Sequence, residues 1–428
     1  MPCVQYNTFA QTTTEISLEQ AVNHALDYNL NLRKTVIDLE ASGYSERRLW
    51  SEIFPTINAN INASYPGTPL FTRTEETPPF SYNNIRYGAG VGINLGLNAG
   101  IPYAMRSIRL AHQSNILRYE DACNQLTIQV TKNFYSLITE KNNLLLLEEV
   151  QNLAQRQHDR NRTLFNNGLI RELVVLQSSL ALENARFNLS MANTAYTNSM
   201  AEFLALLGLA HDTNVILSGE VNIVRISADA EFLIREYLDK RPDIERNKQE
   251  INRLINAQRQ LAMQSRAPSL NLSVDWNTGF DPFDDRVSAS ARLNIPIDPW
   301  IGGTTRSQSI NRAKDSVEKA VLDLEITQNS AKTQIRTLTA LLHNSWNSIL
   351  IARLGYESAQ RNYQMTEQAF NNGTVEYLIL EDARGNMTAA MQRIFQSELS
   401  YLNMILDLSS ALNLDWNLFI HTFGVPGD

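Results

Sequence analysis

Four segments of the chain alternate strictly between apolar and polar residues. They cover residues 56–65, 86–98, 269–277 and 286–298. Because successive side chains of a strand point to opposite sides, each segment predicts a β-strand with one apolar face and one polar face. Each has about the length that crosses a bilayer as a tilted strand, roughly 9–11 residues. One such segment would indicate a half-buried sheet in a soluble protein, whereas four, in two hairpins of an otherwise helical chain, favour a membrane barrel.

In a barrel, the polar faces of these strands line a wet lumen and the apolar faces meet lipid. The expected lumen residues include Asn58, Asn60, Asn94, Asp275 and Arg292. The aromatic residues expected at the lipid interface are Tyr65, Tyr87 and Trp276. About eight strands is the smallest number that closes a useful barrel, and an open sheet in lipid leaves bare edges. The chain must therefore associate with copies of itself, and two copies give eight strands while three give twelve.

Long helices separate the two strand pairs. Residues 103–167 contain no Pro and no Gly, which predicts a rod of roughly 90 Å at about 1.5 Å per residue. Such a length is typical of a coiled coil or a helical array. Gly168 ends the rod, and a second helix is expected over 169–207. The apolar stripe of that helix has coiled-coil spacing, and we expect it to lie against its hairpin partner; it consists of Leu173, Leu176, Leu180, Phe187 and Met191.

The second half of the chain repeats the first. The turn Phe165-Asn166-Asn167-Gly168 returns as Phe370-Asn371-Asn372-Gly373, and the register continues until Asn413 answers to Gly208. This duplication predicts two structural repeats, residues 1–228 and 229–428. Each has the order helix, strand, strand, long helix, helix. The expected helical hairpins are 103–207 and 304–413.

Shorter helices and one irregular segment complete each repeat. An opening helix is expected from Ser17 to about Phe54, and its counterpart in the second repeat is expected over 231–266. Residues 209–228 read as an irregular or β linker between the repeats. The two inner helices, 169–207 and 231–266, are together about as long as one rod, and we expect them to stack end to end.

Composition narrows the class of protein. The 428 residues are 43% hydrophobic and 19% charged, as in a folded protein. A net charge of −8 and a pI near 5.4 argue against a nucleic-acid partner. Mean hydropathy is −0.27, and no stretch approaches the roughly 18 apolar residues of a membrane-spanning helix. Any contact with a membrane is therefore expected to occur through strands.

No pattern in the sequence indicates an enzyme or a cofactor. The six histidines are scattered without metal-ligand spacing, and no glycine-rich phosphate loop precedes a helix. The acidic segment 281–285 reads either as a solvated loop or as a divalent-cation site, although it lacks the spacing of a calcium loop. Cys3 and Cys123 form no metal or redox motif. The first eleven residues read either as the end of a signal peptide or as an ordinary N-terminus.

The order of these elements resembles that of the TolC-like outer membrane efflux proteins. Four further features carry the resemblance: Leu18-Glu19-Gln20-Ala21, Arg241-Pro242-Asp243, the Pro-Ser/Thr pairs that precede strands, and the Asn-Gly-Leu and Asn-Gly-Thr turns. The resemblance extends from about Ile16 to Leu414. It implies a fold that is mainly α with transmembrane β-strands, assembled as a homotrimer. In that assembly a 12-stranded β-barrel in the outer membrane stands on a periplasmic α-helical barrel.

The resemblance also implies partners and sites. The family's tip turns meet a periplasmic adaptor, which links the channel to an inner-membrane pump. The corresponding residues here are Asn167, Gly168, Leu169, Asn372, Gly373 and Thr374. Asn replaces the family's Val in both turns. One of the family's gating aspartates corresponds to Asp382, with Glu381 beside it, while the other positions hold Ile379 and Val174. The alternative for Glu381 and Asp382 is two acidic residues in an ordinary first helical turn.

Two functions follow from these observations. The first is an outer membrane exit duct of a tripartite efflux or type I secretion system, which passively conducts small molecules or proteins from the pump to the outside. The second is a soluble or periplasmic α-helical scaffold or adaptor protein without a pore. A heat-modifiable oligomer in outer membranes would indicate the duct, and a soluble monomer would indicate the scaffold.

Overall fold

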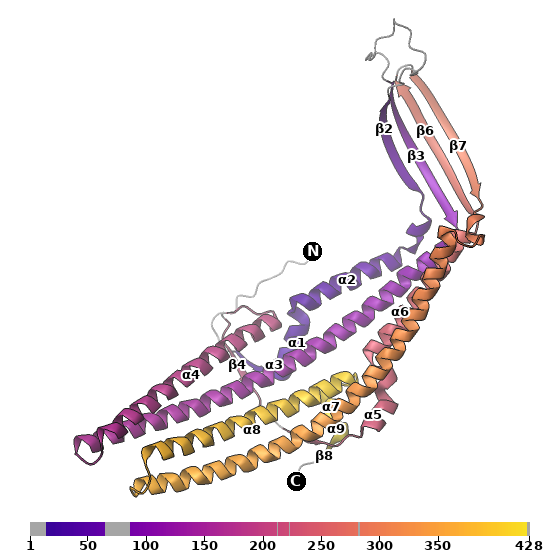
Figure 1. Cartoon of the computed structure of the whole chain (residues 1–428). Coiled ribbons are helices and arrows are strands. Elements are labelled where there is room, and N and C mark those ends of the chain that lie inside the picture. The colour runs from indigo at the N-terminus through magenta and orange to yellow at the C-terminus, as the bar shows by residue number, and fades with distance from the viewer. Residues whose placement is uncertain (1–13, 65–85, 212, 222, 281–282, 426–428) are drawn as a thin grey trace. The chain divides into compact units, whose positions relative to one another are not determined.

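The strand segments form one antiparallel sheet of four strands (Figure 1). The computed structural model describes residues 14–64, 86–211, 213–221, 223–280 and 283–425. The strands are β2 (Thr56–Ser64), β3 (Arg86–Asn98), β6 (Ser269–Phe280) and β7 (Phe283–Asn294), in the order β2-β3-β6-β7. The sheet therefore joins the strand pairs of both halves of the chain, through the pairing of β3 with β6.

The ends of two strands differ from the prediction. The third strand was expected to end at residue 277, but β6 continues to Phe280, which pairs with Phe283. The fourth was expected over 286–298, but β7 runs from Phe283 to Asn294. Pro296 lacks the N–H that a continued ladder requires, and Ile297 precedes a short 3₁₀ helix, η4 (Asp298–Trp300). Residue 65, expected as the last of the first strand, lies outside the described residues.

The chain divides into two units. One contains the sheet and comprises Asp38–Ile116 and Arg246–Glu325; the other comprises the chain up to Ile37, Leu117–Glu245 and Ile326–Asp428. The two long helices belong partly to each unit: α3 (Ile101–Asn166) and α7 (Thr305–Asn371). Both rods have nearly the predicted ends, and Gly355 does not interrupt α7.

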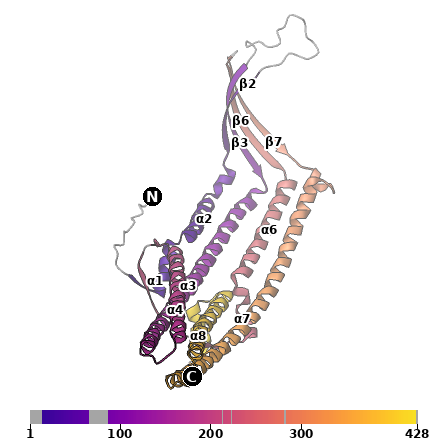
Figure 2. The same cartoon turned by 60° about the vertical axis from the view of Figure 1, so that its left-hand side comes forward.

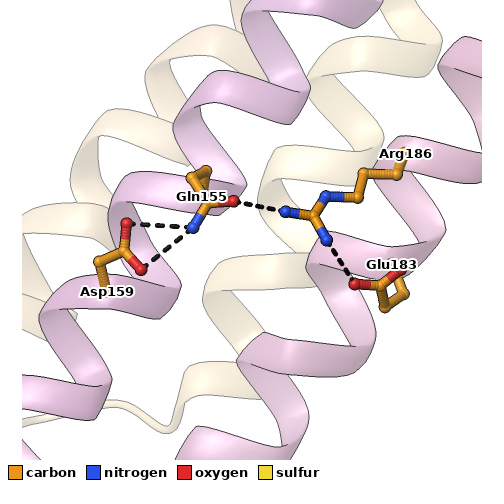
Figure 3. A network of polar contacts seen from close by, with 4 residues as sticks. All are labelled: Gln155, Asp159, Glu183 and Arg186. Carbon is orange, nitrogen blue, oxygen red and sulfur yellow. Dashed lines mark hydrogen bonds and ion pairs between the residues drawn. The ribbon is translucent and has the colours of Figure 1, made fainter.

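In the mainly helical unit, each long helix forms a hairpin with the helix that follows it (Figure 2). The partner of α3 is α4 (Glu172–Leu207), and the partner of α7 is α8 (Tyr377–Ala411). The polar side chains of α3 and α4 meet in the network that Figure 3 shows. Arg186 donates to Gln155 Oε1 at 2.8 Å and to Glu183 Oε1 at 2.7 Å, and Gln155 donates to Asp159. The bond from Arg186 to Gln155 joins the two helices on an exposed face, and the other bonds lie within α4 and within α3.

In its described residues the same unit has two large apolar cores and a small cluster of Ala154, Leu182 and Ala185. The first lies between α1 (Leu18–Tyr28), α3 and α4, and includes Phe134, Phe203 and Leu207. The second lies between α7, α8 and α9 (Trp416–Phe423), and includes Tyr401 and Phe419. α9 was not predicted.

The linker between the repeats contains the expected β structure. β4 (Val215–Ser218) pairs in parallel with β1 (Thr14–Ser17), and β5 (Arg225–Ile226) pairs with β8 (Gly424–Val425). The irregular or β linker expected over 209–228 contains these two short strands. Their pairing with strands near both ends of the chain was not foreseen.

Two predicted helices are each divided. The opening helix, expected from residue 17 to about residue 54, is split into α1, α2 (Leu30–Arg47) and η1 (Leu49–Ile53). Asn29 is extended, with ψ 124°, and separates α1 from α2. The helix expected over 231–266 is split into α5 (Ala230–Tyr237), η3 (Leu238–Lys240) and α6 (Pro242–Arg266). The residue before a proline disfavours the α conformation, and Arg241 accordingly has ψ 137°.

The predicted stacking of 169–207 on 231–266 is wrong. The C-terminal end of α4 packs on α1 instead. Asn29 Nδ2 donates to Leu206 O at 2.8 Å, and His24 Nδ1 lies 2.9 Å from Leu207 O. These side chains reach carbonyl groups that have no partner within the helix at its end. α4 begins at Glu172 rather than residue 169 because the tip turn takes up residues 167–171.

Candidate channel-forming sheet and tip turns

The register of the sheet separates polar from apolar residues onto opposite faces. Asn58, Gly92, Asp275 and Ser288 stand opposite one another in one row across the four strands. The next row along the strands holds Ala59, Val91, Trp276 and Val287. Such rows alternate along the sheet, as the period of two requires. The sheet therefore has one face of Asn, Ser, Gly and charged residues and one face of Ile, Val, Leu and Ala.

All five expected lumen residues lie on the polar face. Asn58, Asn60, Asn94 and Asp275 come from β2, β3 and β6, and Arg292 of β7 stands opposite Asn271 and Gly96. Side chains on this face bind one another across strands. Asn94 Nδ2 donates to Asn58 Oδ1 at 3.3 Å, and the hydroxyls of Ser273 and Ser290 are 2.8 Å apart.

Two of the three expected interfacial aromatics can be placed, and both lie on the apolar face. Tyr87 is the second residue of β3 and stands opposite Ala63. Trp276 stands between Val91 and Val287, within β6 rather than near its end, because β6 continues to Phe280. Tyr65 lies outside the described residues.

Both edges of the sheet lack a partner within the described chain. β2 pairs only with β3, and β7 pairs only with β6. Unpaired edges present a row of N–H and C=O groups. In lipid, each of these groups that is left without a hydrogen-bond partner costs on the order of several kcal/mol. The edges are therefore sites at which another strand can add.

The two tip turns have the same geometry. Gly168 and Gly373 both have the left-handed conformation, with φ of 73° and 74°. Gly168 N donates to Phe165 O at 2.8 Å and Leu169 N to Leu164 O at 2.9 Å; Gly373 N donates to Phe370 O at 2.9 Å and Thr374 N to Ala369 O at 3.0 Å. This is the helix ending in which a left-handed glycine lets two N–H groups reach back to unpaired carbonyls.

The tip residues come together in the mainly helical unit, and they are accessible. Leu169 is 70% exposed, and Asn167, Asn372 and Thr374 are exposed as well. One bond joins the ends of the two long helices, since Arg160 Nη1 of α3 donates to Asn371 Oδ1 of α7 at 3.1 Å. A Cβ at Gly168 or Gly373 would meet nothing within 4 Å, so the conformation of these glycines, rather than lack of space, explains them.

Glu381 and Asp382 have different surroundings. Glu381 Oε2 accepts from Arg384 Nη2 at 2.6 Å, and Glu381 Oε1 accepts from the Tyr377 hydroxyl at 2.9 Å. Asp382 is exposed. The Arg384 guanidinium is buried, so its ion pair with Glu381 compensates a desolvated charge. Of the two carboxylates expected at a gate, Glu381 is bound within its own helix hairpin and Asp382 faces solvent.

Two tyrosines near this ion pair are held in the neutral form. Burial, followed by the charge of Glu367, raises the pKa of Tyr363 to about 12. Burial and the Glu381 carboxylate raise the pKa of Tyr377 well above its usual value. Each hydroxyl donates to a carboxylate, Tyr363 to Glu367 Oε1 at 3.1 Å and Tyr377 to Glu381 Oε1. Ionised tyrosines would face these negative charges at close range.

The coiled-coil stripe of α4 does not pack as predicted. Leu173 is 60% exposed and Leu180 is 64% exposed, and Leu176, Phe187 and Met191 are similarly open. Other residues of α4 are buried instead, among them Ser178, Leu182 and Ala185 in the half of the helix that carries the stripe. Leu180 and Met191 line a groove of about 650 Å³ between α4 and α8, with Leu147 and Val150 of α3.

Other expected features can be placed only in part. In the described residues, no group of three or more His, Cys, Asp or Glu side chains could hold a metal ion. The acidic segment 281–285 lies partly outside the described residues, and Asp285 is in β7. Cys123 is a free thiol, and Cys3 lies outside the described residues. No helix in the described part of the chain is both long and apolar enough to span a membrane.

The glycines of β3 are a feature of the polar face that the sequence analysis did not single out. Gly88, Gly90 and Gly92 occupy alternate positions on the polar face, between side chains of β2 and β6. The sequence shows a run of alternate glycines, but only the structure shows which side chains of β2 and β6 lie beside them.

Known proteins resemble the chain in sequence pattern and in fold. Residues 21–209 and 233–414 match a family described as outer membrane efflux protein. No curated protein sequence matches the chain. A crystal structure of CusC, described in connection with transmembrane channel formation, is 15% identical with a TM-score of 0.73, covering 95% of this chain and 96% of that one.

Two further channels have the same fold. The CmeC outer membrane channel of Campylobacter jejuni is 18% identical with a TM-score of 0.72, over 96% of this chain and 87% of that one. The open MtrE outer membrane channel of Neisseria gonorrhoeae is 17% identical with a TM-score of 0.67, over 93% and 89%. The TM-scores and coverages show a shared fold, and the family match covers most of the sequence.

Proposed function

Because the chain belongs to the outer membrane efflux protein family, we propose that this outer membrane efflux channel is the exit duct of a tripartite efflux or type I secretion system. Substrates would pass through it from an inner-membrane pump to the outside. The duct is passive, since nothing in the sequence indicates a nucleotide site, a cofactor or catalytic chemistry. The helices extend into the periplasm and the sheet lies in the outer membrane.

The observation that carries the proposal is the four-stranded sheet with split faces and two free edges. β2 and β7 run in opposite directions, because the strands alternate across an antiparallel sheet of four. β7 of one copy can therefore pair antiparallel with β2 of the next, and the ring closes without an edge. Three copies supply twelve strands, a barrel wide enough to hold an aqueous lumen. The homotrimer is thus the assembly we propose.

The faces of the sheet then have separate roles. Asn58, Asn60, Asn94, Asp275 and Arg292 line the lumen, and the apolar face meets lipid. Tyr87 and Trp276 belong to the lipid side, and Tyr87, near the start of β3, is the ring that lies near the headgroups. Tyr65, which lies outside the described residues, is proposed for the same side. The two repeats, 1–228 and 229–428, each contribute one pair of strands and one helical hairpin.

The tip turns are the docking sites for a periplasmic adaptor. Asn167, Gly168, Leu169, Asn372, Gly373 and Thr374 form two equivalent turns per chain. Three copies would present six turns. A partner can bind all six in the same manner because both glycines have the same conformation. Repeated weak contacts of this kind add up to strong binding when they are made together.

Asp382 is the gate residue we propose, and Glu381 supports it. A ring of three exposed carboxylates would favour cations by the charge logic of channels. Glu381 holds Arg384 and Tyr377, and thereby fixes the first turns of α8, on which Asp382 lies.

Cross-linking between the edges tests the assembly. Single cysteines are placed along β2 and along β7 in a chain with Cys3 and Cys123 replaced by Ser, and pairs are oxidised in outer membranes. Pairs in which the two cysteines come opposite each other between copies are expected to yield covalent dimers and trimers, because β2 and β7 become neighbours. Cysteines on β3 and β6 are the matched control and should yield none. If no pair links copies and the chain stays in the soluble fraction, the scaffold is the correct function.

A further inference from the structure

Alternate glycines form a column on the polar face of β3. Gly88 stands between Asn62 of β2 and Gly279 of β6, Gly90 stands between Asn60 and Asn277, and Gly92 stands between Asn58 and Asp275. None of the three has the left-handed conformation, so no turn requires them. Glycine inside a strand costs about 0.5–1 kcal/mol relative to alanine. A column of three therefore calls for a reason other than backbone geometry.

The neighbouring side chains occupy the space that a side chain on β3 would take. A Cβ on Gly92 would lie 2.6 Å from Asp275 Oδ1 and 3.1 Å from Asn58 Oδ1. A Cβ on Gly90 would overlap Asn277 Oδ1, and it would lie 3.0 Å from Asn60 Oδ1. The polar groups of β2 and β6 thus reach over β3 from both sides and lie against the glycine backbone.

We propose that Gly90 and Gly92 set the width of the channel by letting Asn277 and Asp275 lie flat on the barrel wall. A methyl group at either position would push the side chain away from the sheet, on the polar face. In a closed barrel that direction is the lumen. The inference rests on the proposed function, because the polar face is a lumen only if copies close the barrel. Three copies repeat each change three times at one level of the barrel, so a small displacement narrows the channel from three sides.

Gly96 provides a control on the same strand and the same face. A Cβ there would lie 3.3 Å from Asn271 Oδ1, with no other atom within 4 Å. Asn271 can give way by a few tenths of an ångström, so Gly96→Ala should leave the width of the channel unchanged. β3 therefore contains glycines at which alanine is expected to narrow the channel, Gly90 and Gly92, and one at which it is not, Gly96.

The test measures how large a reagent can pass the glycine levels. Asn294→Cys is introduced at the last residue of β7, in the row that also holds Asn98 and Ser269. A reagent that enters the barrel at the opposite end of the sheet must pass Gly90 and Gly92 before it reaches this row. Cys3 and Cys123 are replaced by Ser. Intact cells are treated with membrane-impermeant maleimides that carry polyethylene glycol chains of increasing length. Labelling should stop at a definite chain length in this parent.

Gly90→Ala in that background should shift the limit to shorter chains, and Gly96→Ala should not. Adding Asn277→Ala to Gly90→Ala removes the displaced amide and should restore the limit. A second pair, Gly92→Ala with and without Asp275→Ser, makes the same test if a Gly90 variant fails to assemble. An unchanged limit in assembled Gly90→Ala and Gly92→Ala channels would overturn the inference. A parent that reacts equally with all lengths has no enclosed lumen, and this result would overturn the proposed function instead.

Discussion

At the scale of single residues, the tip hairpin of α7 and α8 holds several charges in a small space. The Arg384 guanidinium pairs with Glu381, and Tyr377 and Tyr363 each donate to a carboxylate. All of these groups lie within the two helices that meet at the second tip turn. With both tyrosines neutral, Arg384 faces the two carboxylates Glu367 and Glu381. An ionised tyrosine would add a further negative charge beside them.

We therefore predict that the protein loses stability above pH 10. An unfolded tyrosine releases its proton near pH 10, whereas folded Tyr363 keeps it until about pH 12. Between these values the unfolded state binds fewer protons than the folded state, so the free energy of unfolding falls as pH rises. The contribution is fully present below pH 10. Thermal unfolding of the wild type and of the Tyr363→Phe/Tyr377→Phe variant, measured from pH 9 to 12, should show a steeper decline for the wild type. Parallel curves would show that the two tyrosines do not contribute.

The exposed carboxylate of Asp382 gives a second prediction at this scale. Asp382→Asn should reduce the preference of the channel for cations, because a ring of three charges is removed. Asp382→Glu keeps the charge and should keep the preference. The measurement is the reversal potential in a salt gradient across a planar bilayer. The same reversal potential in Asp382→Asn and the wild type would remove Asp382 from the gate.

At the scale of elements, the side chain of Asn29 links α1, α2 and α4 where they meet. Asn29 is buried, and its Oδ1 accepts from Asn31 N at 2.9 Å and from Leu32 N at 3.0 Å, which caps α2. Its Nδ2 donates to Leu206 O at the end of α4. One amide therefore caps the start of α2 and the end of α4, two helices that are far apart in the sequence.

Asn29→Ala should lower the free energy of unfolding by about 1–3 kcal/mol, because it leaves a helix start and a helix end without partners. Asn29→Asp keeps the two acceptor bonds but turns a carboxylate oxygen toward Leu206 O, and we expect a similar loss. Thermal or denaturant unfolding in detergent measures both. If Asn29→Asp were as stable as the wild type, capping of α2 alone would explain the residue.

The tip turns give the other prediction at this scale. Proline at Gly168 or Gly373 removes the N–H that donates to Phe165 O or Phe370 O, and it fixes φ near −65° where the turn has a positive φ. Gly168→Pro and Gly373→Pro should therefore weaken co-purification of a periplasmic adaptor and leave the trimer intact. Gly355→Ala, in the middle of α7 with open space around it, is the control. A trimer that is lost together with docking would make the turns determinants of assembly.

Much of the fold could be predicted from the sequence, and the features that were not predicted have a common cause. Alternation predicted the two faces of the sheet, and Gly168, Gly208, Gly373 and Asn413 predicted helix ends that all have a positive φ. These features depend on local geometry. The break at Asn29, the end of α4 against α1 and the pairing of β1 with β4 depend on contacts between distant segments, which a single sequence does not reveal.

The candidate sites follow the same division. The sequence placed the residues proposed for the lumen on one face of the sheet and the tip residues in two equal turns, because strand period and glycine geometry are local. It did not show that Arg384 engages Glu381, nor that Asn277 and Asp275 lie over the glycines of β3. The apolar stripe of α4 was expected to be buried but is exposed in the chain. Spacing along one helix does not show which other helix its apolar side chains contact.

At the scale of the whole molecule, the chain is incomplete as a membrane protein when it is alone. Its sheet ends in two free edges, and its polar face is open. A lipid environment accepts such a sheet only when the edges are paired. Everything proposed for the lumen, the gate and the glycine column therefore depends on how many copies come together.

The number of subunits in mild detergent tests this claim most directly. Native mass spectrometry of protein extracted from outer membranes should show three copies of the chain, about three times 48.4 kDa, which dissociate on heating. Twelve strands then close the barrel. A single, water-soluble copy with its sheet buried in a compact body would contradict the account.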